Sequence, residues 1–126
     1  MSRNGTGPLQ HVIRATRYSF QGLRHAWAKE AAFRYEIYVL AAALPAAWLL
    51  VKGAIERALM IGSVLLVVVV ELINSAIEAT VDRVSKEPHE LSGHAKDMAS
   101  AAVFVAIVLA AIVWLVLLLG GWNYFH

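Results

Sequence analysis

Residues 58–82 read ALMIGSVLLVVVVELINSAIEATVD, and this stretch decides the fold. Its uncharged first half is shorter than the roughly 20 apolar residues that a helix needs to cross a bilayer. Because Glu56 and the arginine after it close the stretch on one side, a spanning helix must continue beyond Glu71. The sequence therefore predicts a transmembrane helix over about residues 57–82, which carries Glu71 and Asn74 into or near the hydrocarbon.

Two more uncharged stretches lie on either side of this helix. The later one, residues 98–124, is long enough to span the bilayer by itself, so a second spanning helix is expected at about 97–120. The earlier one, residues 37–51, must borrow from the residues before it, which places a third spanning helix at about 31–51. The pattern predicts three transmembrane helices.

The composition supports a membrane protein. The chain has 126 residues, of which 60% are hydrophobic and 16% charged, against about 45–50% apolar and 25% charged in a soluble domain. We expect a single domain over residues 1–126, because a soluble fold of this size cannot bury so much apolar surface. The absence of cysteine excludes disulfides and thiolate metal sites, and a net charge of +2 gives no reason to expect nucleic acid as a partner.

The N-terminal segment has a different character. Over residues 9–27 the apolar positions form one helical stripe, and basic side chains cluster beside it. This pattern is typical of an amphipathic helix that lies in the headgroup plane; the alternative is a helix packed on protein. The stripe consists of Leu9, Val12, Ile13, Phe20, Leu23 and Trp27, and the basic cluster of Arg14, Arg17 and Arg24.

The basic residues predict the orientation of the chain. Only Lys52 and Arg57 lie in the turn between the first two spans, and none of the 11 Lys and Arg residues follows the last span. Cytoplasmic loops carry the excess of basic residues in bacterial membrane proteins. We therefore expect a cytoplasmic N-terminus and an external C-terminus. The basic residues on the cytoplasmic side are Arg3, Arg14, Arg17, Arg24, Lys29, Arg34, Arg83, Lys86 and Lys96.

Four oxygen-bearing side chains share one face of the predicted helix at 57–82. Glu71, Asn74, Glu78 and Asp82 lie within a sector of roughly 80° at about 100° per residue. Carboxylates in hydrocarbon are costly, so such groups face a cavity or another subunit and are functional by default. The alternative is that Glu78 and Asp82 are simply solvated where the helix leaves the membrane.

Residues on the other helices favour phosphate chemistry at the same level. Glu30 and Glu78 form a plausible carboxylate pair for Mg²⁺, which completes its coordination with phosphates and water. Lys96 and Asp97 are expected to open the last span, where a lysine and a helix N-terminus favour an anion. The alternative for this pair is an ordinary charged helix start. No Walker or protein-kinase motif is present in the sequence.

Four segments together resemble the prokaryotic diacylglycerol kinase family. They are SFQGLRHAW at 19–27, EAAFR at 30–34, ELINSAIEATVDR at 71–83 and HELSGHAKDM at 89–98. The resemblance implies an all-α inner-membrane homotrimer, with one surface helix and three spans per protomer and active sites shared between subunits. It also implies transfer of the γ-phosphate of ATP, with Mg²⁺, to the hydroxyl of diacylglycerol, which gives phosphatidic acid and ADP.

The resemblance also assigns roles to residues. Glu71 corresponds to the proton acceptor, with Asn74 beside it, and Glu30 and Glu78 correspond to the metal-holding carboxylates. Positions matching ATP contacts are His11, Tyr18, Glu30, Glu78, Glu87, Pro88, His89, Lys96 and Asp97. Positions matching lipid contacts are Ala15, Thr16, Arg17, Tyr18, Ser19, Phe20, Arg24, His25, Ala26, Trp27, Ala32, Phe33, Arg34, Tyr35, Glu36, Trp48, Arg57, Glu71 and Ser100.

Two positions depart from the family pattern. His11 stands where the family often has a nucleotide-binding arginine, and Pro88 stands where an aromatic residue is common. Histidine is a weaker, pH-dependent cation. Within a lipid kinase the alternative acceptor is a polyprenol such as undecaprenol. A small cation-coupled transporter also uses intramembrane glutamates, but it needs no lysine and metal set at the cytoplasmic level, and a membrane adaptor leaves the Glu71 face unexplained.

Overall fold

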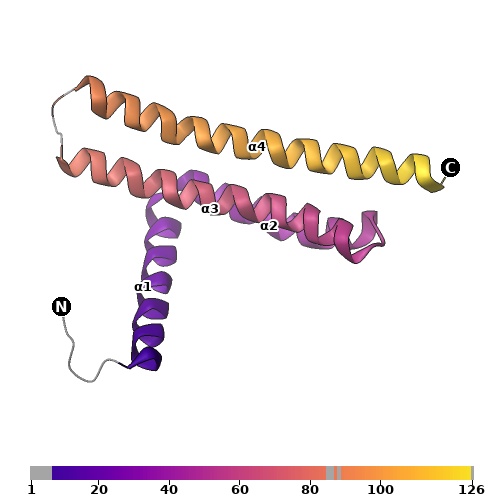
Figure 1. The fold of residues 1–126 in the computed structure, drawn as a ribbon, viewed down its shortest axis with the longest axis horizontal. Helices are drawn as coiled ribbons and strands as arrows, with labels where there is room; N and C mark the ends of the chain where they lie inside the picture. The colour runs from indigo at the N-terminus through magenta and orange to yellow at the C-terminus, as the bar shows by residue number, and fades with distance from the viewer. Residues whose placement is uncertain (1–6, 85–86, 88, 126) are drawn as a thin grey trace.

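The computed structural model describes residues 7–84, 87 and 89–125. These residues form four helices, α1 (Pro8–Lys29), α2 (Ala31–Leu50), α3 (Ala54–Val84) and α4 (Glu90–Phe125). The last two form a long antiparallel hairpin, α2 packs along α3, and α1 projects sideways from this bundle (Figure 1). The expected all-helical architecture, one amphipathic helix followed by three long apolar helices, is therefore confirmed for the described part of the chain.

A single residue makes the corner between α1 and α2. Glu30 has φ −114° and ψ 105°, an extended conformation that ends one helix and begins the next. Arg34 locks this corner, because its Nη1 donates a hydrogen bond of 2.7 Å to the carbonyl oxygen of Trp27. The Trp27 ring also meets that of Tyr38 edge-on, with 5.7 Å between the centroids. These contacts direct α1 away from the bundle and hold Glu30 against it.

One of two buried clusters lies at the turn end, by which we mean residues 47–60 around the α2–α3 turn together with residues 114–118 of α4. Met60 and Ala47 are fully buried there, with 0% of their surface exposed, and Leu117 and Leu118 pack against them. Trp114 adds a polar tie, since its Nε1 donates to the carbonyl oxygen of Met60 over 3.0 Å. A side chain of α4 thus satisfies a backbone group of α3.

Arg57 closes the end of α2 within this region. Its Nε donates to the carbonyl oxygen of Val51 over 3.0 Å, and its Nη2 donates to that of Trp48 over 2.9 Å. The guanidinium also stacks 4.0 Å from the centroid of the Trp48 ring. The last carbonyl groups of a helix lack intrahelical partners, so Arg57 supplies donors that the end of α2 otherwise lacks.

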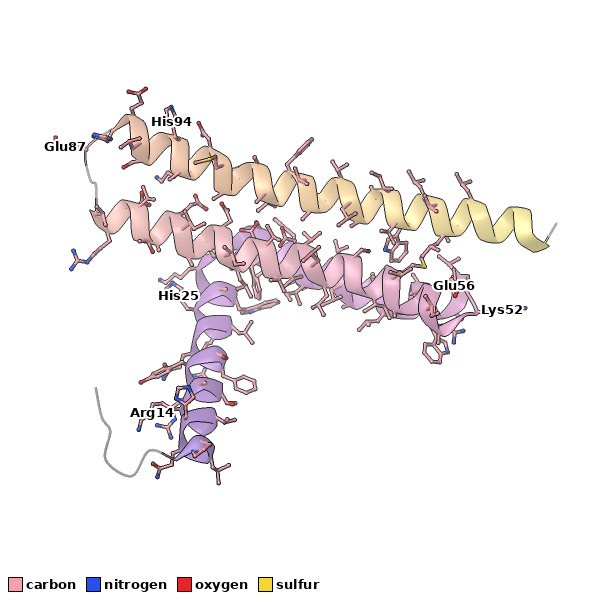
Figure 2. All side chains as sticks on the ribbon, viewed as in Figure 1. Arg14, His25, Lys52, Glu56, Glu87 and His94 are labelled. Atoms are coloured by element: carbon pink, nitrogen blue, oxygen red, sulfur yellow. The ribbon has the colours of Figure 1, made fainter. Side chains whose placement is uncertain are left out.

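The surface of the bundle is apolar between two charged ends. In the described residues, three helices are long and apolar enough to cross a membrane: α2, α3, and α4 as far as Gly120. Only 6% of the apolar stretch of α4 is buried within the chain. Glu87 and His94 lie at one end of the hairpin, and Lys52 and Glu56 at the other (Figure 2). A bilayer or neighbouring chains must cover the apolar surface between them.

Candidate functional site

Polar side chains gather where residues 71–82 of α3, the corner at Glu30 and the first turns of α4 come together. We call this region the polar end. Glu71 is the deepest of them, because only 5% of its surface is exposed and the buried Val67 and Val68 precede it by about one turn. It is the only buried charged side chain in the described residues. The sequence predicts that Glu71 lies deepest in the membrane, and the structure buries its side chain within the protein.

Ser75 joins Glu71 to the corner between α1 and α2. Its Oγ lies 3.3 Å from Oε2 of Glu71 and 3.0 Å from Oε1 of Glu30, with hydrogen-bond geometry to both. The structure thus brings together two carboxylates that are far apart in the sequence. Sequence reasoning missed Ser75, although a hydroxyl four residues after a buried glutamate on the same helix face was a usable signal.

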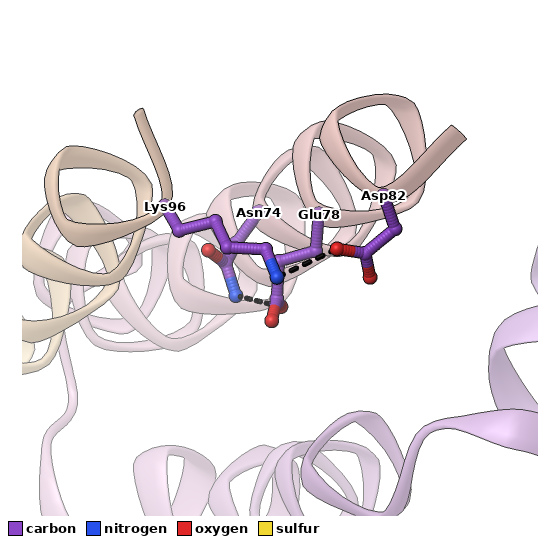
Figure 3. A network of polar contacts seen from close by, with 4 residues as sticks. All are labelled: Asn74, Glu78, Asp82 and Lys96. Carbon is purple, nitrogen blue, oxygen red and sulfur yellow. Dashed lines mark hydrogen bonds and ion pairs between the residues drawn. The ribbon is translucent and has the colours of Figure 1, made fainter. Parts of the chain in front are cut away.

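The next turn of α3 holds a second pair. Asn74 Nδ2 donates a hydrogen bond of 3.0 Å to Oε1 of Glu78, and both side chains are partly buried (Figure 3). The other amide atom, Oδ1 of Asn74, is buried and has no hydrogen-bond partner in the described residues. A buried acceptor without a donor is costly, so this oxygen is available to a ligand that brings a positive charge or a hydrogen-bond donor.

An ion pair links the polar ends of α3 and α4. Lys96 Nζ lies 2.6 Å from Oδ1 of Asp82, and Figure 3 shows the lysine reaching across from α4. The side chains are 40% and 63% exposed, respectively. Exposed pairs contribute only about 0–1 kcal/mol to stability. The geometric effect is larger, because the ammonium group is held beside the acidic face of α3.

The start of α4 differs from the expectation. The last span was expected to open at Lys96 and Asp97, but the helix begins at Glu90, so both residues lie in its second turn. His89 explains the early start, since its Nδ1 accepts a 3.1 Å hydrogen bond from the backbone N–H of Leu91, and its carbonyl oxygen accepts another from Gly93. With its first turn capped in this way, the helix tolerates Gly93.

A second carboxyl group accompanies Glu71. Glu36, on α2, is partly buried and approaches Glu71 closely enough for a hydrogen bond between the two carboxyl groups. Its Oε1 has no hydrogen-bond partner in the described part of the chain. Glu36 was expected only as a lipid contact, and its position beside Glu71 was not foreseen. The two glutamates lie on different helices, so sequence spacing gave no signal for their approach.

A cavity of about 520 Å³ opens between α1 and α3, and Ser75 connects it to Glu71. Its polar lining residues are Ser19, His25, Glu30 and Ser75, and the rest of its wall is mostly apolar. Three of its lining residues, Ser19, His25 and Ala26, belong to the positions predicted to contact lipid. An apolar cavity with a few polar groups is the usual form of a small-ligand site, so this cavity is the natural place for an amphiphilic substrate.

Several predicted site residues lie away from this cavity. His11 and Tyr18 are exposed on α1, which extends away from the bundle, whereas His89 and Glu87 lie at the α3–α4 connection (Figures 1 and 2). Pro88 lies outside the described residues. The remaining predicted lipid contacts on the two N-terminal helices are all exposed apart from the partly buried Arg34: Ala15, Thr16, Arg17, Phe20, Arg24, Trp27, Ala32, Arg34 and Tyr35.

Three other predicted lipid contacts have different surroundings. Phe33 is only 3% exposed and packs with Ala26 and Val68 in the core under the corner, and its predicted lipid contact stays a prediction. Trp48 and Arg57 bind each other at the turn end, at the opposite end of α3 from Asp82. Ser100 lies exposed on α4.

The metal pair expected from the sequence, Glu30 and Glu78, stays a prediction. Glu30 contacts Ser75, Glu78 contacts Asn74, and the described residues contain no group of three or more His, Asp or Glu side chains that suits a metal ion. The donor chemistry nevertheless fits Mg²⁺, which prefers carboxylate and carbonyl oxygens and takes the rest of its shell from phosphates and water. The unpartnered Oδ1 of Asn74 adds a further oxygen on this face.

Comparison with known proteins places the chain in a family. A sequence model described as prokaryotic diacylglycerol kinase matches residues 17–118. The Escherichia coli (strain K12) protein named diacylglycerol kinase is 55% identical over 126 residues, which cover 99% of each chain. The proteins of the same name from Haemophilus influenzae and Helicobacter pylori (strain J99) are 50% identical over 109 residues and 40% identical over 106. These matches cover 86% and 84% of this chain and 92% and 83% of the two relatives.

Proposed function

The chain belongs to the prokaryotic diacylglycerol kinase family, and on this premise we propose that it transfers the γ-phosphate of ATP to the hydroxyl of diacylglycerol. The products are phosphatidic acid and ADP, and the reaction takes place at the bacterial inner membrane. The observation that carries the proposal is the burial of Glu71, at 5% exposure, and its hydrogen bond from Ser75, which lines a mostly apolar cavity together with Glu30.

Glu71 is the proton acceptor in this proposal. The attacking hydroxyl must lose a proton as the phosphate–oxygen bond forms, and a positioned carboxylate contributes about 10²–10⁴-fold through such a transfer. Glu71 is positioned by the Ser75 hydroxyl and is accompanied by Glu36. Asn74 lies one turn along the same face and orients Glu78. The deep carboxylate thus meets the lipid alcohol, and the shallower groups meet the nucleotide.

Glu78 and Glu30 are the carboxylates that hold Mg²⁺ in this proposal, with ATP as co-substrate. When bound, the ion neutralises charge on the phosphate oxygens. The chain itself positions the phosphates: Lys96 supplies a cation that Asp82 holds beside the acidic face. Asp97, Glu87 and His89 belong to the same end of the molecule and complete the nucleotide contacts.

We propose that the active unit is a homotrimer with shared sites. One chain leaves the apolar surface of α4 largely uncovered and holds His11 and Tyr18, on α1, apart from the α3–α4 connection. A neighbouring chain both covers the apolar surface and completes the site. The test mixes inactive Glu71→Gln and Lys96→Met proteins under subunit exchange. Recovery of activity supports shared sites, and no recovery contradicts them.

The function is tested with purified protein in detergent, MgATP labelled at the γ-phosphate, and dioleoylglycerol. We expect labelled phosphatidic acid from the wild-type chain and none from Glu71→Gln. A competing assay with undecaprenol at equal concentration tests the acceptor, and we expect diacylglycerol to be preferred. Exclusive labelling of undecaprenol, or no labelled lipid at all, would overturn the proposal. The excess of basic residues in the N-terminal segment and the α3–α4 connection supports a cytoplasmic location for the polar end, where ATP is available.

A further inference from the structure

Ser75 differs from the other hydroxyl residues of these helices. Thr16, Ser19 and Thr80 each donate to the carbonyl oxygen four residues earlier in their own helix, over 2.8 to 2.9 Å. This is the usual choice for a hydroxyl in a helix interior. Ser63, which is buried, donates to the carbonyl oxygen of Met60. Ser75 instead contacts two carboxylates, so its hydroxyl is directed to the site and not to the backbone of its own helix.

The hydroxyl has one proton to give and two acceptors to satisfy. Oε1 of Glu30 lies 3.0 Å from the Ser75 Oγ, and Oε2 of Glu71 lies 3.3 Å from it. A serine hydroxyl is a single donor, so the two carboxylates share one hydrogen-bond donor. Any movement of one carboxylate changes the bond that is available to the other. Two groups with different roles in the proposed reaction are therefore linked through one side chain.

The burial of these groups strengthens the effect of the shared hydrogen-bond donor. Glu71 is buried, whereas Glu30 is only partly buried and lines the cavity together with Ser75. Hydrogen bonds to a charged group are stronger than those between neutral groups. Away from water, no solvent molecule replaces a lost donor without rearrangement. The orientation of both carboxylates thus depends on the Ser75 hydroxyl, which lines the cavity beside Glu30.

We propose that Ser75 is a positioning residue that sets the orientation of the Glu71 and Glu30 carboxylates together, and so couples the proton acceptor to the cation-binding group. The inference rests on the proposed function. It predicts that the loss of one hydroxyl alters two properties that the carboxylates control separately. We expect Glu71→Gln to lower kcat and Glu30→Gln to raise the Mg²⁺ concentration that is needed for activity. Ser75→Ala is expected to do both.

The first experiment measures steady-state kinetics of Ser75→Ala with MgATP and dioleoylglycerol in detergent. We expect kcat to fall about tenfold, as for the loss of one charge-assisted hydrogen bond at a reacting group, with the KM for dioleoylglycerol changed less than twofold. The Mg²⁺ concentration for half-maximal activity rises several-fold. Ser75→Thr keeps the donor and is expected to restore kcat to within threefold of wild type.

The matched control is Ser63→Ala on the same helix. It removes a buried hydroxyl that donates to a backbone carbonyl, far along α3 from the carboxylates. We expect its kcat and its Mg²⁺ requirement to equal those of wild type. If both alanine variants lose kcat in parallel with thermal stability, Ser75 has only a structural role and the proposal fails.

A binding measurement supplies a readout that does not depend on turnover. Mn²⁺ is added in the presence of a non-hydrolysable ATP analogue, and the concentration of free Mn²⁺ is measured from its spectrum. The bound Mn²⁺ is the difference between the total and the free concentration. We expect weaker Mn²⁺ binding in Ser75→Ala than in wild type, and no further weakening when Ser75→Ala is added to Glu30→Gln. Additive effects overturn the coupling, as does an unchanged Ser75→Ala. A wild-type protein that forms no phosphatidic acid contradicts the proposed function instead.

Discussion

The two ends of the bundle are built differently. At the turn end, Met60 and Ala47 are fully buried, and the carbonyl groups that end α2 receive donors from Arg57. At the polar end a buried oxygen of Asn74 has no hydrogen-bond partner in the described residues, and the same holds for Oε1 of Glu36 on the neighbouring α2. The turn end thus satisfies the end of α2 with donors from its own chain, whereas the region around Glu71 keeps side-chain oxygens without a partner in the described residues. The difference separates the part that stabilises the fold from the part that performs chemistry.

The largest effect is expected at Glu71. Glu71→Gln keeps the shape of the side chain and removes the proton acceptor, so kcat falls about 10²–10⁴-fold. Binding of an ATP analogue stays within about twofold of wild type, because Glu71 does not contact the nucleotide in this account. Single-turnover kinetics with labelled ATP and equilibrium binding measure the two quantities. Full activity in the purified variant would refute the assignment.

The cation-binding carboxylates are expected to give the next largest effect. Glu78→Gln and Glu30→Gln each remove one negative oxygen donor, so the Mg²⁺ concentration for half-maximal activity rises about tenfold. Titration of activity with Mg²⁺ at fixed ATP measures the change. Glu56→Gln, at the opposite end of α3, is the matched control and leaves the curve in place. Unchanged curves for both site variants contradict the metal assignment.

Substitutions at the turn end should lower the free energy of unfolding and leave kcat unchanged. Met60→Ala leaves a cavity among fully packed side chains, so the free energy of unfolding falls by about 2–5 kcal/mol. Met60→Leu, which nearly conserves the volume, costs less than about 1.5 kcal/mol. Unfolding in mixed micelles by a denaturing detergent measures both. If the folded fraction of Met60→Ala lost its kcat as well, the separation between the two ends would fail.

A smaller change is expected at Trp114. Trp114→Phe removes the 3.0 Å hydrogen bond to the carbonyl oxygen of Met60 and keeps most of the ring. The loss of one such bond destabilises the fold by about 0.5–1.5 kcal/mol. The same unfolding assay detects the shift, with Phe104→Leu on the exposed face of α4 as the control. A shift equal to that of the control would show that the hydrogen bond contributes nothing.

The ion pair between α3 and α4 gives the smallest effect on stability. Asp82→Asn removes one charge from an exposed pair, and the free energy of unfolding changes by less than about 1 kcal/mol. We expect a change in the KM for ATP that exceeds the change in stability, since Asp82 holds Lys96 in place. A variant that unfolds readily but keeps its KM contradicts this role.

The sequence anticipates the groups that a single helix places together. An acidic residue directly after a long apolar run predicts a buried carboxylate, and Glu71 is buried. The spacing of four residues between Asn74 and Glu78 predicts neighbouring side chains, and they form a hydrogen bond. Such contacts depend only on the helical period.

Contacts that depend on how helices meet were not anticipated. The Ser75 bond to Glu30 requires the one-residue corner between α1 and α2, and the approach of Glu36 to Glu71 requires the packing of α2 on α3. The early start of α4 depends on a cap from His89, which overrides the turn preference of Gly93. Helical periodicity carries no information about these tertiary arrangements.

The central claim is that the acidic face of α3 runs from a site sheltered inside protein to the aqueous surface. The chain contains no cysteine, so Glu71→Cys and Asp82→Cys each introduce a single reactive thiol. The direct measurement is the rate at which a membrane-impermeant maleimide labels each variant in inverted membrane vesicles. We predict labelling at position 82 at least about tenfold faster than at position 71, because thiols shielded from water react slowly. Equal and rapid labelling at both positions would contradict the claim.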